Sequence, residues 1–141
     1  MRFKKAKLIA NLANAVQAIC GVDAEAGELV GLAREEGRAA LRAAGIQFVA
    51  EDFDDVRGRW ERWGVGEIEG RTRGGGSTWQ SIVRGTGSIE TDYLNGEIVL
   101  HGRLTGVPTP VNELLQALAR ETVRDCHEPG WMSAEDVLAR V

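Results

Sequence analysis

The apolar residues of this 141-residue chain recur mostly at helical spacing, and this periodicity constrains the fold more than any other feature. Side chains three and four positions apart share one face of an α-helix, where they can be buried together. In the first segment, residues 3–20, this set comprises Leu8, Leu12, Val16 and Ile19, and Gly21 follows as a stop signal. We therefore predict an all-α fold, in which residues 1–141 form a single helical bundle.

The next part of the chain continues this pattern and then breaks it. Asp23 is placed to cap a second helix over residues 24–44, which Gly45 ends. A third helix is expected over residues 47–63. Residues 64–77, GVGEIEGRTRGGGS, are glycine-rich and charged without a helical period, so we predict a mobile loop there. Its glycines do not match a phosphate-binding fingerprint, and no predicted strand precedes them.

The C-terminal part of the chain also reads as helical. A short helix is predicted over residues 79–84. The segment 107–125 has prolines near its first turn, Thr109 as a cap candidate and leucines at helical spacing, which is typical of a helix start. Ser133 stands three residues before Asp136, close to a capping box, and predicts a terminal helix.

One stretch conflicts with an all-helical fold. The sequence ETDYLNGEIVLHG, Glu90 to Gly102, places Asn95-Gly96 between two apolar-rich runs, which is the strongest short-range signal for a β-hairpin. A two-stranded hairpin without a partner sheet is only marginally stable, and the surrounding segments are helical. We predict a helix over residues 89–104, although Gly96 inside it costs about 1 kcal/mol relative to alanine.

Composition narrows the classes of function. A net charge of -4 provides no basic field for nucleic acid, so we predict no nucleic-acid partner. No apolar run approaches the length of a membrane span, and the N-terminus does not resemble a signal peptide. The two cysteines and two histidines, Cys20, Cys126, His101 and His127, lack the spacing of a zinc site. We therefore predict no metal and no membrane partner, and two reduced thiols favour a cytoplasmic protein.

Four polar residues of the first predicted helix share one face. On a helical wheel, Lys4, Lys7, Asn11 and Asn14 fall within about a quarter of a turn. A solvated surface is the ordinary interpretation of such a pattern. Asparagine is a poor helix former, however, so two asparagines in line with a lysine favour a face whose amides bind a ligand.

Together with motifs later in the chain, this face resembles the C-terminal domain of the ketopantoate reductase family. That family has a Lys-Leu pair followed by two asparagines, a serine-rich helix start, a Glu-x-Asp-x-x-Asn-Gly helix, and a proline-containing segment that opens the next helix. The matching residues are Lys7-Leu8, Asn11, Asn14, Ser77-Thr78, Glu90-x-Asp92-x-x-Asn95-Gly96 and Gly106-Val107-Pro108-Thr109-Pro110. The resemblance implies an all-helical domain similar to the C-terminal domain of 6-phosphogluconate dehydrogenase.

The resemblance assigns catalytic roles to two residues. Lys7 matches the acid that protonates the carbonyl of a 2-oxo acid as hydride arrives from NADPH, a role that desolvation of a lysine favours because it lowers the pKa. Glu90 matches the residue that accepts a hydrogen bond from a substrate hydroxyl. The alternative for Glu90 is a first-turn carboxylate stabilised by the helix dipole. Asp92 and Asn95 are expected to be structural.

Four further residues match the substrate-binding positions of the family. Asn11 and Asn14 correspond to asparagines that hydrogen-bond the lysine and the substrate, although Asn14 stands three residues after Asn11 where many members have four. Ser77 or Thr78 corresponds to the serine that meets the substrate carboxylate. The segment before Glu90 is one residue longer here than in the family, so either Ser77 or Thr78 can be the matching residue. The alternative for Ser77 is an N-cap role.

The family holds NADPH mainly through a preceding Rossmann domain, whose Gly-x-Gly-x-x-Gly turn binds the pyrophosphate. This chain has no such motif, so we expect that domain to be absent and leave the cofactor-binding residues of this chain unassigned. The leading hypothesis is the substrate-binding domain of a 2-dehydropantoate 2-reductase-like oxidoreductase of pantothenate biosynthesis. The alternatives are a stand-alone helical module that forms a homodimer or another complex, and a relative that reduces a different oxo acid or an imine.

Overall fold

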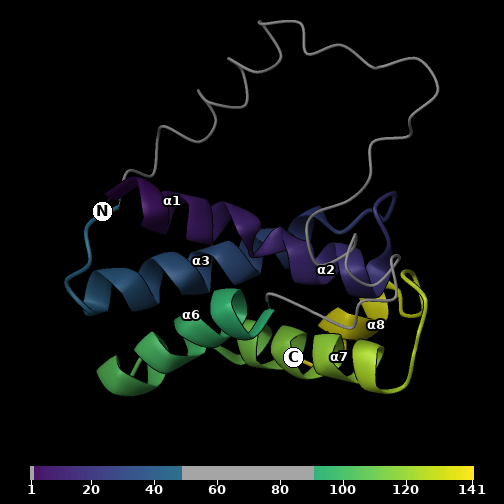
Figure 1. Ribbon diagram of the computed structural model, residues 1–141. Coiled ribbons are helices and arrows are strands. Elements are labelled where there is room, and N and C mark those ends of the chain that lie inside the picture. The colour runs from purple at the N-terminus through teal and green to yellow at the C-terminus, as the bar shows by residue number, and fades with distance from the viewer. Residues whose placement is uncertain (1, 49–90) are drawn as a thin grey trace, which may run out of the picture.

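The computed structural model describes residues 2–48 and 91–141, and all regular structure in these two ranges is helical. The elements are α1 (Arg2–Asn11), α2 (Ala13–Cys20), α3 (Gly27–Ala43), α6 (Thr91–Thr105), α7 (Pro110–Arg124) and α8 (Ala134–Leu138). Figure 1 shows α1 and α3 side by side, with the α6–α7 pair against the other side of α3. The prediction of an all-α fold is confirmed. The expected loop at 64–77 and helix at 79–84 lie outside the described residues.

The predicted first helix is divided into two. Leu12 keeps helical backbone angles, φ -58° and ψ -25°, but its amide donates to the carbonyl of Ile9, at 3.4 Å, instead of to the carbonyl four residues back. This local tightening separates α1 from α2 while the chain continues in roughly the same direction. Leu12 is fully buried at the junction, where it contacts α3 near Gly37.

The second helix begins later than predicted. Ala26 precedes the first turn of α3, so the prediction that Asp23 caps this helix is wrong. The expected end is close to the observed one, because Ala43 is the last helical residue and Gly45 adopts the left-handed conformation, at φ +69°. Gln47 and Phe48 lie outside any helix, and the remainder of the predicted helix 47–63 falls outside the described residues.

Residues 91–105 form helix α6, so the helix prediction for this stretch is confirmed and the hairpin signal is false. Its buried residues are Thr91, Asn95, Ile98, Val99 and Gly102. This face differs from the apolar periodicity of the sequence, because Tyr93 and Leu100 are exposed. Gly102 faces the connection to α7, and a Cβ at this position would lie 2.6 Å from the carbonyl oxygen of Val107. The missing side chain therefore allows the chain to turn back closely against α6.

The two C-terminal helices begin in different ways. Thr109 occupies the N-cap position of α7, as expected, but its side chain makes no capping hydrogen bond. Ser133 does cap α8, since its hydroxyl accepts a hydrogen bond from the amide of Asp136 at 3.1 Å. The prediction for Ser133 is thus confirmed, and the first turn of α7 takes its capping group from elsewhere.

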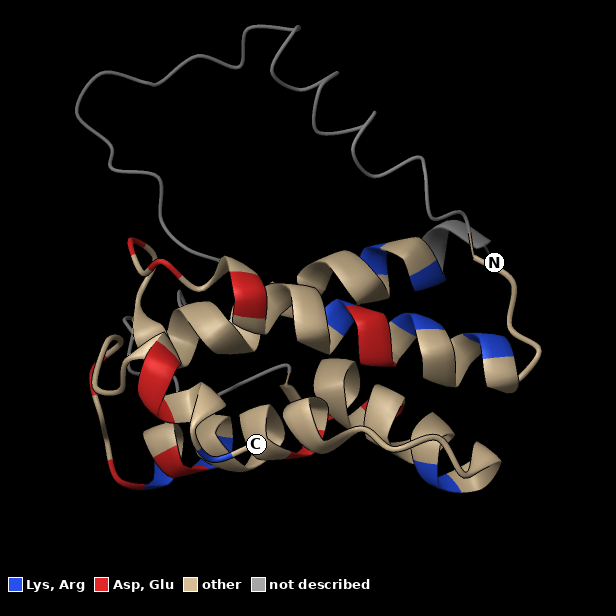
Figure 2. Ribbon diagram, turned by 180° about the vertical axis from the view of Figure 1, so that it is seen from behind, with Lys and Arg blue, Asp and Glu red and all other residues tan. Residues whose placement is uncertain are grey.

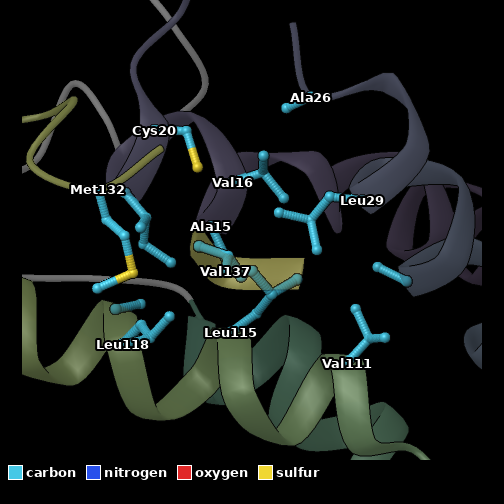
Figure 3. Close-up of a cluster of buried hydrophobic side chains, with 13 residues drawn as sticks. Ala15, Val16, Cys20, Ala26, Leu29, Val111, Leu115, Leu118, Met132 and Val137 are labelled. Carbon is cyan, nitrogen blue, oxygen red and sulfur yellow. The ribbon is translucent and has the colours of Figure 1, made fainter. Parts of the chain in front are cut away.

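Two hydrophobic clusters lie along α3. The larger one joins α2, α3, α7 and α8 and includes Val16, Leu29, Leu115 and Val137 (Figure 3). The smaller one joins α1, α3 and α6 and includes Ile9, Leu41 and Ile98. Because α3 contributes to both clusters, it is the central element of the bundle. No helix in the described part of the chain is long and apolar enough to cross a membrane.

Both cysteines are free thiols in different surroundings. Cys20 belongs to the larger hydrophobic cluster, and burial raises the pKa of its thiol to about 11. Cys126 is exposed after the end of α7.

The close approach at Gly102 gives a stability prediction. A Gly102→Ala variant would force its methyl group against the carbonyl of Val107 and the side chain of Thr109, at 2.6 and 2.7 Å. We expect the free energy of unfolding to fall by about 1–3 kcal/mol, as for other overpacked sites. Urea unfolding followed by circular dichroism measures this change.

Gly31 provides the matched control for this prediction. It also lies within a helix, α3, but a Cβ there would meet no atom within 4 Å. Gly31→Ala should therefore gain up to about 1 kcal/mol through helix propensity alone. Equal effects of the two substitutions would contradict the packing role of Gly102.

Candidate functional site

Helix α1 places its lysines on different sides. Lys5 forms an ion pair with Glu97 of α6, which also lies 3.7 Å from His101. Two residues further along, Lys7 is rotated by about 200° and exposed to solvent, whereas the neighbouring Leu8 is buried. The described residues therefore do not provide the desolvation that the sequence analysis expected for Lys7, and they leave its amine accessible.

The two asparagines of the predicted face lie on either side of the α1–α2 junction. Asn11 is the last residue of α1 and Asn14 belongs to the first turn of α2, and both are half-buried. Because Leu12 between them keeps helical angles, Lys7, Asn11 and Asn14 remain on roughly one side of the chain. The structure thus keeps three of the predicted site residues close to one another along the backbone.

The other predicted site residues lie outside the described part of the chain. Ser77 and Thr78 fall in the undescribed range, and so does Glu90. Glu90 directly precedes Thr91, the first residue of α6.

A buried polar network that the sequence analysis missed connects α3, α6 and α7. The carboxylate of Glu36 accepts hydrogen bonds from the backbone amides of Val111 and Asn112, each at 2.9 Å. These two amides belong to the first turn of α7, so a side chain of α3 supplies the cap that Thr109 does not. The negative charge also interacts favourably with the N-terminal end of the helix dipole.

Two fully buried asparagines extend this network to α6. Asn112 donates from its side-chain nitrogen to the carbonyl of Ala33 at 2.9 Å and to Glu36 at 2.8 Å. Its side-chain oxygen accepts a hydrogen bond from Asn95 at 3.0 Å. Asn95 therefore has the structural role expected of it, and Glu36 is the partner that the sequence did not reveal. In the sequence, Glu36 stands among other charged residues of α3 and cannot be told from a surface glutamate.

Two buried oxygens at the start of α6 remain without a partner in the described part of the chain. They are the hydroxyl of Thr91 and the side-chain oxygen of Asn95, one helical turn apart on the face that α6 buries. An unsatisfied buried polar group costs about 1–3 kcal/mol. The buried face at the start of α6, next to Glu90 in the sequence, therefore carries two acceptors that the described residues leave unsatisfied.

Asp92 holds the outer side of the same turn against α7. Its carboxylate accepts hydrogen bonds from Gln116 and from the Nε of Arg120, both at 2.8 Å. Partial burial alone would raise the pKa of Asp92, but the hydrogen bonds from Arg120 and Gln116 and the arginine charge outweigh it and hold this pKa below its ordinary value. Asp92 thus has the structural role that the sequence analysis expected.

Positive charge gathers near the N-terminus of this acidic chain. Figure 2 shows lysine and arginine residues on α1 and along the neighbouring α3. In α3, the basic residues Arg34, Arg38 and Arg42 flank the acidic pair Glu35 and Glu36. The end of the bundle that carries Lys7 is therefore locally basic despite the net charge of -4.

Comparison with known proteins identifies the family of this chain. A family model described as "Ketopantoate reductase PanE/ApbA C terminal" matches residues 1–123. The chain belongs to the ketopantoate reductase family. It carries the helical C-terminal domain of that family, which confirms the resemblance seen in the sequence.

A solved structure supports the same assignment. The PanE/ApbA family ketopantoate reductase from Ralstonia eutropha JMP134 superposes with a TM-score of 0.64 at 35% sequence identity. The match covers 88% of this chain and 41% of that protein. This chain thus spans less than half the length of that ketopantoate reductase. The comparison with curated protein sequences gave no match.

The Glu36 cap gives a second stability prediction. A Glu36→Ala variant would leave two first-turn amides of α7 and one side-chain N–H of Asn112 without their acceptor. We expect a loss of about 2–4 kcal/mol, since a lost helix cap and an unsatisfied buried amide each cost about 1–2 kcal/mol. Thermal unfolding of the variant measures this loss.

Glu35→Ala is the control for this substitution. Glu35 neighbours Glu36 on α3 and carries the same charge, but it is exposed. Its removal should change the stability by less than about 0.5 kcal/mol. A comparable loss in both variants would show that charge on α3, and not the cap, explains the effect.

Proposed function

We propose that this chain is the substrate-binding and proton-donating domain of an NADPH-dependent 2-oxo acid reductase of the 2-dehydropantoate 2-reductase type. The observation that carries the proposal is the family match over residues 1–123, which includes every residue of the candidate site. A preceding dinucleotide-binding domain would complete the enzyme, and the share of 41% of the Ralstonia protein leaves room for one. NADPH, when bound there, supplies the hydride.

Lys7 is the proposed acid. Hydride arriving at the carbonyl carbon leaves negative charge on the oxygen, and a positioned ammonium group lowers the barrier by donating a proton to it. The exposure of Lys7 on α1 supports this role, because the amine is free to meet a substrate from outside the described bundle. Docking of a second domain over this face would shield the amine from bulk water.

The remaining site residues would bind and orient the substrate. Asn11 and Asn14, on the same side of the chain as Lys7, would hydrogen-bond the lysine and the oxo acid. Ser77 or Thr78 would meet the substrate carboxylate, and Glu90 would accept a hydrogen bond from a substrate hydroxyl. The basic character of α1 and α3 supports an anionic substrate, which it would attract by long-range electrostatics.

The described residues themselves do not fit a dinucleotide. A pyrophosphate site of the Rossmann type needs a glycine-rich turn between a strand and a helix. Residues 2–48 and 91–141 contain no strand. The cofactor would therefore be held mainly by the preceding domain, in a protein that we place in the cytoplasm.

A second candidate function is a helical interaction module, which could act through a homodimer. One observation favours it: Tyr93, Leu100 and Leu104 of α6 are 79%, 54% and 72% exposed. They lie at positions i, i+7 and i+11 and therefore form one apolar stripe. Sedimentation of the chain distinguishes a self-associating module from a monomeric substrate domain.

Replacement of Lys7 tests the proposed chemistry. The chain would be joined to the dinucleotide-binding portion of the Ralstonia relative, and NADPH oxidation followed with ketopantoate and other 2-oxo acids. We expect Lys7→Ala to lower kcat by about 10²–10⁴-fold, the range for loss of a general acid. An unchanged rate would overturn the assignment.

Lys5→Ala is the matched control, because it removes a lysine from the same helix. Lys5 pairs with Glu97 on the side that faces α6, away from Lys7. We expect this variant to keep its kcat, with at most a small loss of stability from the ion pair, about 0–1 kcal/mol. Equal losses of activity would indicate a general effect of charge on α1.

A further inference from the structure

Three side chains of metal-binding type converge at the C-terminal end of α7. They are Glu121, Asp125 and His127, and one ligand atom from each lies within 4.8 Å of the others. Ligand atoms around a tetrahedral zinc ion lie about 3.4 Å apart, given bonds of about 2.0–2.2 Å. Each pair therefore has to approach by no more than about 1.4 Å, which side-chain rotation alone achieves.

The imidazole of His127 is already held in position. It stacks on the ring of Trp131, with ring centroids 4.2 Å apart and an angle of 13° between the planes. The indole nitrogen of Trp131 donates to the hydroxyl of Thr122 at 2.9 Å, and this hydroxyl donates to the carbonyl of Leu118 at 2.7 Å. The helix that carries Glu121 thus also fixes the plane of the imidazole, and outer contacts of this kind orient metal ligands.

The electrostatic environment favours a cation. The three residues lie at the C-terminal end of a fifteen-residue helix, where the helix dipole is negative. Two carboxylates balance a divalent charge.

The pair between Arg124 and Asp125 is the competing interaction. Its two contacts measure 2.6 and 2.7 Å, but both side chains are substantially exposed. Exposed ion pairs of this kind contribute little to stability. A metal ion can therefore draw the Asp125 carboxylate away at small cost.

We propose that Glu121, Asp125 and His127 form a binding site for a divalent transition-metal ion, with zinc as the best match and water in the remaining position. One imidazole with two carboxylates suits zinc, whereas magnesium and calcium prefer oxygen ligands only. The prediction of no metal rested on the spacing of cysteines and histidines, which does not reveal carboxylate ligands. Asp125 and His127 lie beyond the family match, which ends at residue 123, so the site is independent of the proposed reductase function.

The metal ion would have a structural effect. It would tie the end of α7 to the segment that leads through Trp131 to α8. An ion that binds only the folded state stabilises it by mass action, so the melting temperature should rise with zinc concentration.

Calorimetric titration of the full, untagged chain with zinc chloride tests the proposal. We expect one binding site, together with a rise in melting temperature. Glu121→Gln and His127→Gln should each weaken zinc binding by at least about tenfold, since even residues outside the ligand shell cost 10–100-fold. Glu128→Gln is the matched control: it removes the same charge from a nearby exposed glutamate outside the trio and should bind zinc like the wild type.

Three outcomes would overturn the proposal. The first is wild-type zinc affinity in both ligand variants, provided that circular dichroism shows them folded. The second is an equal thermal shift with magnesium chloride, which would indicate charge screening by surface carboxylates. The third is loss of binding in Cys126→Ser with retention in His127→Gln, which would assign the ion to the neighbouring thiol.

Discussion

The carboxylate of Glu36 is the group on which the arrangement of the helices depends. It reaches from α3 to the first amides of α7, and through Asn112 it connects to Asn95 of α6. Glu36 is half-buried, and these donors compensate a charge that is costly to leave unpaired away from water. The two hydrophobic clusters lie on either side of this network along α3. The network thus helps to set the positions of α6 and α7 along the axis of α3.

Helix α3 also supports the α1–α2 junction, which carries the candidate site residues Asn11 and Asn14. Gly37 follows Glu36, and a Cβ there would lie 2.8 Å from the side chain of Ile9 and 3.0 Å from that of Leu12. The absent side chain lets the α1–α2 junction rest directly on α3. Helix α3 is thus the common base for the lysine-bearing helix and for α6, whose first residue follows Glu90.

The sequence predicted the helical class, the helix over 89–104 and the Ser133 cap, because these depend on periodicity and on neighbouring residues. It did not predict the junction at Leu12, since the surrounding periodicity continues through it. It also placed Thr109 at the start of α7, where it lies, but the carboxylate that accepts from the amide of Val111 belongs to Glu36, 75 positions before Val111. Contacts of this kind depend on the packing of whole helices, which no local pattern encodes. Of the site, it placed Lys7, Asn11 and Asn14 on one face of the first helix, and their roles remain predictions.

The contrast between the two thiols has a practical consequence. Only a thiolate reacts rapidly with electrophiles, and the pKa of about 11 keeps Cys20 protonated in the core. Cys126 is the other cysteine of the chain, and it is exposed next to His127. A maleimide dye at neutral pH should therefore attach at a single place without any engineering. The native protein offers a ready position for a fluorescent reporter beside the end of α7.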